Sequence, residues 1–219
     1  MLNILIVEKD LNYCIEIINI VIKNNEKLRL CGIATTIDDA LNFIKEGSID
    51  IILINESFLA KLETKRLEKL KKLTYITFSK KYDLETLNIK INKVMVNLRK
   101  NDRDKQLKTL IENELLYLGY NPKYKGFNYL IETIFILNNL DKYFSENLSK
   151  DIYPLVATKF NTSPDNVKDD IRNATEAMYY DCPESKLSEY LGFDISDIPK
   201  PKTVICAIEN NIRKKYNYS

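Results

Sequence analysis

The first 80 residues alternate short, strongly apolar runs with segments whose apolar side chains recur at helical spacing. This alternation constrains the fold more than any other feature of the sequence. Apolar runs of four to eight residues are typical of buried strands, and strands that alternate with helices indicate a parallel sheet with helices on both faces. The expected strands are 3–7, 28–34, 50–54 and 75–78, and the expected helices are 13–22, 37–44 and 59–73.

The regular alternation ends after Ser79. In residues 80–97 we expect one more strand, such as 93–96, and a helical segment. Residues 97–106 (NLRKNDRDKQ) contain a single apolar residue, Leu98, so this stretch is either an exposed linker or a charged first turn of the next helix. The predicted division is an α/β domain over 1–98, a linker over 99–106 and a helical domain over 107–219.

The second half shows only helical spacing. Gly119 and Gly192 each follow an apolar periodic segment, and glycine commonly ends a helix. We therefore predict an all-α domain. The expected helices are 107–118, 127–136, 151–160, 164–180, 185–191 and 202–215.

Two compositional features exclude several kinds of site. The chain contains no histidine, which excludes imidazole zinc sites, serine-type triads and histidine acid–base catalysis. The four cysteines are far apart and form no C-x-x-C pair, so we expect them to be reduced and buried. We therefore expect no metal, no cofactor and no enzymatic activity.

The sequence also bears on location. No apolar run approaches the roughly 20 residues that span a bilayer. The first ten residues, MLNILIVEKD, lack the basic start and small-residue cleavage site of a secretory signal. We expect a cytoplasmic protein with no membrane contact.

Residues 153–180 carry the pattern of a helix-turn-helix. Ser163 before Pro164 is a strong helix start, because the hydroxyl accepts from a free N–H and proline suits the first helical position. A turn over 161–163 separates this helix from the preceding one, and such a pair can place its second helix in the major groove of DNA. The apolar stripe of the second helix consists of Val167, Ile171, Ala174 and Met178.

The opposite, polar side of that helix suits base reading. Arginine and lysine read guanine, asparagine reads adenine, and aspartate accepts from cytosine. The alternative is a merely solvated helix face, and residues 106–219 carry 14 Lys and Arg against 16 Asp and Glu, whereas DNA-binding domains are usually basic. The candidate DNA contacts are Ser163, Asn166, Lys168, Asp169, Arg172, Asn173, Lys200 and Lys202, the last as a backbone phosphate contact.

Several short motifs occur in a shared order and spacing over the second half. They are Leu118-Gly119, Lys125-Gly126-Phe127 with Tyr129-Leu130, Tyr153-Pro154, Lys159-Phe160-Asn161-Thr162, Ile171-Arg172 and Lys200-Pro201. With them, the region resembles the DNA-binding domain of the stage-zero sporulation protein A family of response regulators. The resemblance implies a six-helix domain that binds DNA as tandem copies and regulates promoters. Where that family has a Glu-Arg pair and a histidine, this chain has Lys168-Asp169 and Asn173, which predicts a different operator or weaker specific binding.

The first half resembles a response-regulator receiver, a flavodoxin-like domain, here possibly truncated. Active receivers hold Mg²⁺ with two acids after the first strand and phosphorylate an aspartate that ends the third strand. Here the corresponding positions are Glu8, Lys9 and Asp10, then Asn55, with Ser79 at the end of the fourth strand and no Lys-Pro after the last one. An amide forms no stable acyl phosphate, and Lys9 would put an ammonium where a metal-binding carboxylate is needed. We predict a pseudo-receiver; the alternative is that these are only loop residues at strand ends.

Three functions compete at this point. The first is a DNA-binding transcription regulator of sporulation or related development, acting without phosphorylation at residue 55 and as a homodimer through the receiver-like domain or on DNA. The second is an antagonist that pairs with a true family member or its kinase and does not read DNA. The altered Lys168-Asp169 pair and the acidic second half favour this second function. The third, an active phosphoryl-transfer intermediate, is weakest because Asn55 removes the acceptor.

Overall fold

The computed structural model describes residues 1–59, 74–80, 83–139 and 147–216. The chain divides into two compact units, Met1–Arg99 and Lys100–Ser219, each with its own apolar core. Of the helix predicted over 59–73, residues 60–73 lie outside the described residues.

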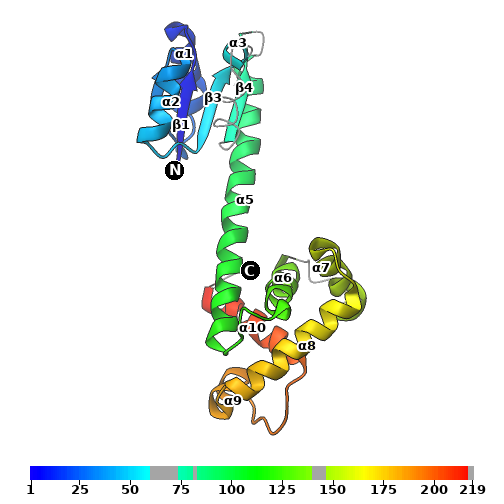
Figure 1. The fold of residues 1–219 in the computed structure, drawn as a ribbon. Helices are drawn as coiled ribbons and strands as arrows, with labels where there is room; N and C mark the ends of the chain where they lie inside the picture. Colours follow the sequence, from blue (N-terminus) through cyan, green and yellow to red (C-terminus); the bar gives the residue numbers. More distant parts are fainter. Residues whose placement is uncertain (60–73, 81–82, 140–146, 217–219) are drawn as a thin grey trace. The chain divides into compact units, whose positions relative to one another are not determined.

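The N-terminal unit contains a four-stranded, fully parallel sheet, shown in Figure 1. Its strands lie in the order β2-β1-β3-β4, which is the order of a flavodoxin-like sheet up to the fourth strand. Each strand was predicted from its apolar run, and all four are confirmed. Their bounds are β1 Leu2–Val7, β2 Leu28–Ala34, β3 Ile51–Asn55 and β4 Thr74–Phe78.

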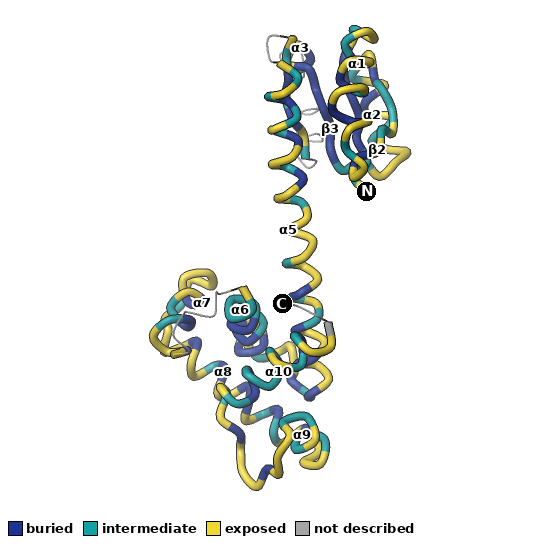
Figure 2. Tube along the Cα trace, turned by 180° about the vertical axis from the view of Figure 1, so that it is seen from behind, coloured by how far each residue is buried: buried dark blue, intermediate teal, exposed yellow. Residues whose placement is uncertain are grey.

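Helices cover both faces of this sheet, as the sequence predicted. Successive side chains of a strand point to opposite faces, so β1 sends Ile4 and Ile6 to one core and Leu5 and Val7 to the other. Figure 2 shows the central strands as buried. The first core is closed by α1 (Leu11–Ile17), η1 (Ile18–Ile22) and α5 (Leu84–Tyr117), and the second by α2 (Ile37–Glu46) and α3 (Glu56–Leu59).

Helix α5 corrects one prediction, because no strand forms over residues 93–96. Leu87, Ile91 and Met95 follow one another at four-residue spacing and are all buried against the sheet. That helical face continues through the short apolar run that suggested a strand. Residues 99–106, for which a linker and a charged helical turn were both open, lie within α5.

The C-terminal unit is entirely helical in its described residues and has one apolar core. The helix predicted over 107–118 is the end of α5, which begins at Leu84, and the other predicted helices are present within a few residues of their expected bounds. Besides the end of α5, the unit contains α6 Lys125–Asn139, η2 Leu148–Ile152, α7 Tyr153–Phe160, α8 Pro164–Asp181, α9 Glu184–Leu191 and α10 Pro201–Tyr216.

Helices α6 and α8 cross at Gly126. A Cβ atom at this position would lie 2.1 Å from the carbonyl oxygen of Asp170 and 2.8 Å from the Cβ of Ala174. Only a residue without a side chain permits this approach, so Gly126 sets how closely α8 packs on the core.

None of the helices in the described part of the chain has the length and apolar character needed to cross a membrane.

Candidate nucleic-acid interface and receiver-like pocket

The turn between α7 and α8 has the predicted three residues. Asn161 ends α7 in the left-handed conformation, with φ 52°, and its backbone N–H bonds to carbonyls of the last turn of α7. The Ser163 hydroxyl accepts from the backbone N–H of Asn166 at 3.1 Å, and Pro164 occupies the first turn of α8. Both helix ends at the turn are thus capped by side-chain or backbone groups of the turn itself.

Helix α8 has two chemically distinct sides. Val167, Ile171, Ala174 and Met178 are each at most 2% exposed and pack in the core of the C-terminal unit. The predicted reading residues Asn166, Lys168, Asp169, Arg172 and Asn173 are all exposed. The helix therefore presents the polar side that base reading needs.

Two of these polar residues contact each other. Arg172 Nη2 lies 3.5 Å from Asp169 Oδ1, and both side chains are more than half exposed. Exposed pairs of this kind contribute little to stability. Their consequence is local: the guanidinium that would read guanine has a carboxylate as its neighbour.

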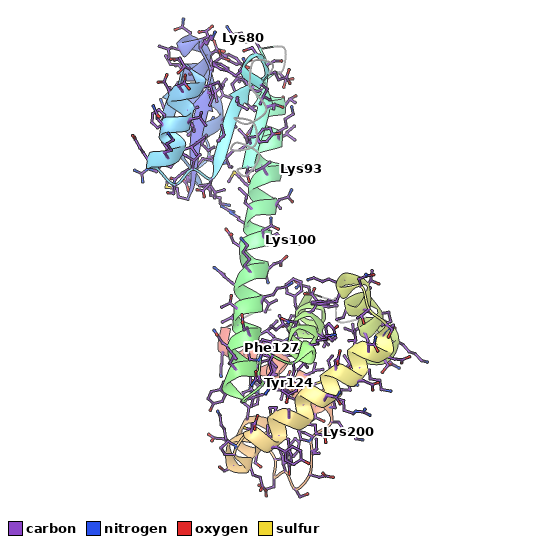
Figure 3. The ribbon with its side chains drawn as sticks, viewed as in Figure 1. Lys80, Lys93, Lys100, Tyr124, Phe127 and Lys200 are labelled. Carbon is purple, nitrogen blue, oxygen red and sulfur yellow. The ribbon has the colours of Figure 1, made fainter. Side chains whose placement is uncertain are left out.

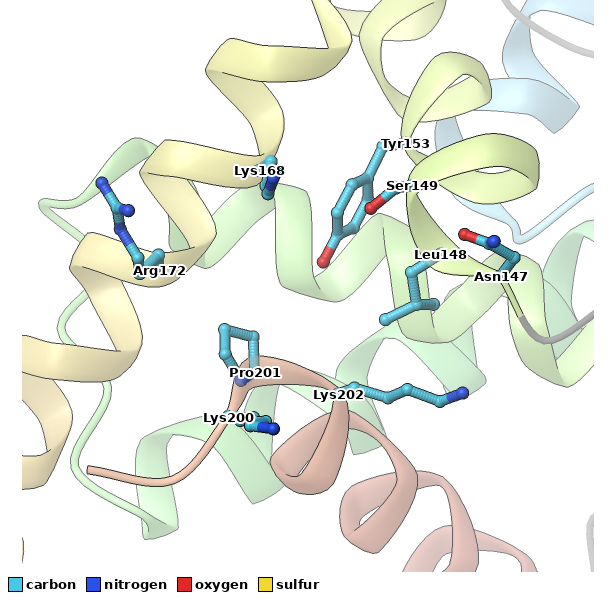
Figure 4. A pocket seen from close by; sticks show the side chains of 9 residues that line it. All are labelled: Asn147, Leu148, Ser149, Tyr153, Lys168, Arg172, Lys200, Pro201 and Lys202. Carbon is cyan, nitrogen blue, oxygen red and sulfur yellow. The ribbon is translucent and has the colours of Figure 1, made fainter. Parts of the chain in front are cut away.

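The structure brings four of the predicted DNA contacts together. Lys168 and Arg172 of α8 line a cavity of about 580 Å³ together with Lys200 and Lys202 at the start of α10. Figure 3 labels Lys200, and Figure 4 shows the cavity, with Lys200 on the segment that leads into α10. Its other lining residues, Asn147, Leu148, Ser149, Tyr153 and Pro201, include polar groups of η2 and α7 that were not predicted. Nothing in their spacing marks them, since they come from different helices.

A buried carboxylate ties α7 to the rest of the unit. Glu132 on α6 is 7% exposed and accepts from Lys108 Nζ of α5 at 2.8 Å and from Lys159 Nζ of α7. Burial alone would raise the pKa of Glu132, but the hydrogen bonds from the two lysines outweigh burial and lower the pKa. The ionised Glu132 thus holds the first helix of the helix-turn-helix in place.

Residues 111–212 match the family model described as sporulation initiation factor Spo0A C terminal. This region of the chain is therefore a domain of the Spo0A C-terminal type. The match covers the helix-turn-helix, the core beneath it and the start of α10. The C-terminal unit is accordingly a DNA-binding domain of the sporulation-regulator type, as the sequence motifs implied.

The carboxyl ends of β1 and β3 bring Glu8, Asp10 and Asn55 together in the N-terminal unit. The side-chain amide of Asn55 donates to Glu8 Oε2 at 2.5 Å, and the backbone N–H of Asp10 donates to Glu8 Oε1 at 2.9 Å. Glu8 is 4% exposed and Asn55 is 8% exposed. Both oxygens of the first acid are therefore already hydrogen-bonded within the chain.

Lys80 is a part of this pocket that the sequence prediction missed. It lies two residues after the end of β4 at Phe78 and forms an ion pair with Asp10; Figure 3 labels it. The hydrogen bond from Lys80 lowers the pKa of Asp10, and the same bond raises the pKa of Lys80. The available signal was a lysine immediately after Ser79 at a strand end, where the prediction sought one only after a later strand.

The side chain of Lys9 lies beside the ring of Phe58. Lys9 is exposed, with Nζ 5.7 Å from the centroid of the Phe58 ring, so the cation paired with the pocket's acids is Lys80. Ser79 directly follows β4, and the described contacts include no hydrogen bond from Ser79 to Glu8, Asp10 or Asn55. Among the described residues, no group of three or more acidic or cysteine side chains is arranged to hold a metal ion.

Proposed function

We propose that this protein is a member of the Spo0A family and a transcription regulator that binds double-stranded DNA through α8 and works without phosphorylation at residue 55. The observation that carries the DNA-binding part is the exposed polar side of a capped second helix in a domain of this family. Bases would be read by Asn166, Lys168, Arg172 and Asn173, with backbone phosphates at Lys200 and Lys202.

Salt dependence of binding to random duplex DNA tests this function. Phosphate contacts release counterions, so the affinity should fall steeply as salt rises. Arg172→Ala should reduce the preference among sequences, because a bidentate base contact contributes about 1–3 kcal/mol of discrimination. Lys202→Ala should weaken all sequences alike and flatten the salt dependence. Lys45→Ala, an exposed lysine of the N-terminal unit, is the charge-matched control. If neither interface variant differs from that control, α8 is not the reading helix.

The proposal that the N-terminal unit is not phosphorylated at residue 55 rests on the contacts among the residues of the receiver-like pocket. Asn55 offers an amide that donates to Glu8, and Lys80 pairs with Asp10, so the groups that would hold Mg²⁺ and a phosphoryl group are engaged with each other. Incubation with a small phosphodonor and Mg²⁺ should leave the intact mass unchanged. A stable phosphoprotein modified in the N-terminal unit would overturn this part of the proposal. We also propose that the protein is not an enzyme.

A second candidate function is an antagonist that pairs with a family member or its kinase without reading DNA. The contact of Asp169 with Arg172 favours it, because that carboxylate reduces the positive charge of the reading side. The two functions differ in a direct test. An antagonist would show no salt-dependent DNA retention and would lower the DNA binding of an active family member in the same solution. A regulator would bind DNA by itself.

Homodimerisation and a cytoplasmic location complete the proposal. Tandem DNA sites favour two linked readers, because the second binding event takes place at a high effective concentration. Sedimentation analysis of the free chain and of its DNA complex distinguishes a dimer formed through the N-terminal unit from one formed only on DNA. A complex that contains a single chain at saturation would exclude both.

A further inference from the structure

The cavity beside α8 is lined by a tyrosine whose hydroxyl the base-reading role does not use. Tyr153, at the start of α7, is 5% exposed and packs in the core of the C-terminal unit, yet its hydroxyl points into the cavity in Figure 4. Within the described part of the chain, no residue forms a hydrogen bond with this hydroxyl. A hydroxyl that faces a cavity can take a bound ligand or a solvent molecule as its hydrogen-bond partner.

The surroundings of the hydroxyl select an anion. Lys168, Arg172, Lys200 and Lys202 line the same cavity, and none of its described lining residues is acidic. Asp169 of α8 forms an ion pair with Arg172 and is not a lining residue of the cavity. Four cations around a cavity of about 580 Å³ create a positive potential that an oxyanion would neutralise.

The hydroxyl itself is a donor under ordinary conditions. Burial raises the pKa of Tyr153 above its usual value of 10, so the group stays protonated at neutral pH. Its ring is fixed by the core, which means that little side-chain entropy is lost when the hydroxyl donates to a ligand. The flexible lysines can then adapt their ammonium groups to the same oxyanion.

We propose that this cavity is a phosphate site, in which the Tyr153 hydroxyl donates to a phosphate oxygen whose charge the surrounding lysines and Arg172 balance. The phosphate comes either from the backbone of bound DNA or from a free phosphorylated small molecule. The first source rests on the proposed DNA-binding function, and the second does not. In both cases Tyr153 is a phosphate-binding residue on α7, outside the recognition helix.

The test uses the full chain with Tyr153→Phe, which keeps the ring and removes only the hydroxyl. Tyr129→Phe is the matched control, since Tyr129 is also buried in this core and does not line the cavity. One arm measures affinity for labelled duplexes of several sequences. Loss of a hydrogen bond to a charged group should weaken all of them by about tenfold, with no change in sequence preference.

The other arm follows amide NMR shifts of residues 147–149 and 202 during addition of inorganic phosphate, with chloride at equal ionic strength as reference. A DNA effect without a phosphate response identifies the DNA backbone as the source. Phosphate-specific shifts that Tyr153→Phe abolishes, with DNA affinity unchanged, identify a free phosphate ligand. If Tyr153→Phe matches the wild type in both arms, the inference is wrong. If the wild type binds no DNA, the proposed function fails, and the phosphate arm alone decides the inference.

Discussion

Replacing Gly126 by alanine tests whether the close crossing of α6 and α8 holds helix α8, the proposed reading helix, in place. The added Cβ would lie 2.1 Å from the Asp170 carbonyl oxygen, and ordinary contact begins at 3.4 Å, so the helices must separate by about 1.3 Å. The obstructing atom belongs to the backbone and cannot rotate away. Overpacking of a core typically costs about 1–3 kcal/mol, whereas alanine is favoured over glycine in a helix by about 1 kcal/mol. We expect an overpacking cost of about 3 kcal/mol, and hence a net loss of about 2 kcal/mol in the free energy of unfolding.

Urea unfolding followed by circular dichroism measures this loss. With a slope of about 2 kcal/mol per molar urea, the transition of the C-terminal unit should move about 1 M lower. Asn128→Ala, on the exposed side of the same helix, should shift it by much less. Adding Ala174→Gly to Gly126→Ala should restore little, because the nearest atom is the Asp170 oxygen. A Gly126→Ala variant as stable as the wild type, or more stable, would show that helix propensity outweighs the crossing and would refute this reasoning.

Three further predictions follow from single contacts. Ser163→Ala removes the cap of α8 and should lower the free energy of unfolding by about 1 kcal/mol in the same assay, whereas Ser196→Ala, at an exposed loop position, should not. Glu132→Gln should lower the free energy of unfolding at pH 7. The difference from the wild type should shrink as the pH falls below the ordinary Glu pKa of 4.5 and through the lowered pKa of the folded state, because wild-type Glu132 then loses its charge. A difference that does not change with pH would contradict an ionised Glu132. Asn55→Asp should remain unphosphorylated by a small phosphodonor while Lys80 is present, because the Lys80 ammonium is paired with the Asp10 carboxylate. The double variant Asn55→Asp with Lys80→Ala should be phosphorylated more readily. Equal phosphorylation of the two variants would show that Lys80 does not block the pocket.

Most of the secondary structure could be predicted from local patterns. Runs such as residues 50–54 are apolar throughout because β3 is buried on both faces, and the helical spacing of α8 is maintained over 18 residues. The Ser163-Pro164 helix start was equally readable, since a cap acts within one turn. The strand expected at 93–96 was wrong because four apolar-rich residues fit either period, and only packing of Leu87, Ile91 and Met95 on the sheet selects the helix.

The groups that make up the two sites depend on contacts between distant positions. Lys80 meets Asp10 across 70 residues of sequence, and Lys108 and Lys159 meet on Glu132 from opposite directions along the chain. Tyr153 was noted in the sequence as part of a helix and of the Tyr153-Pro154 motif, and its hydroxyl becomes a candidate phosphate-binding group because residues of α8 and the start of α10 line a cavity beside it.

The amino-acid pattern alone was therefore sufficient for the succession of helices and strands, the two sides of α8 and the missing phospho-acceptor at Asn55. Each of these follows from side-chain chemistry and a period of two or 3.6 residues. Tertiary packing decided which cation closes the receiver-like pocket and which hydroxyl lies among the lysines of the interface. These contacts between side chains of distant segments depend on how closely the helices approach, as at Gly126. The periodicity of one segment contains no information about its distance from another segment.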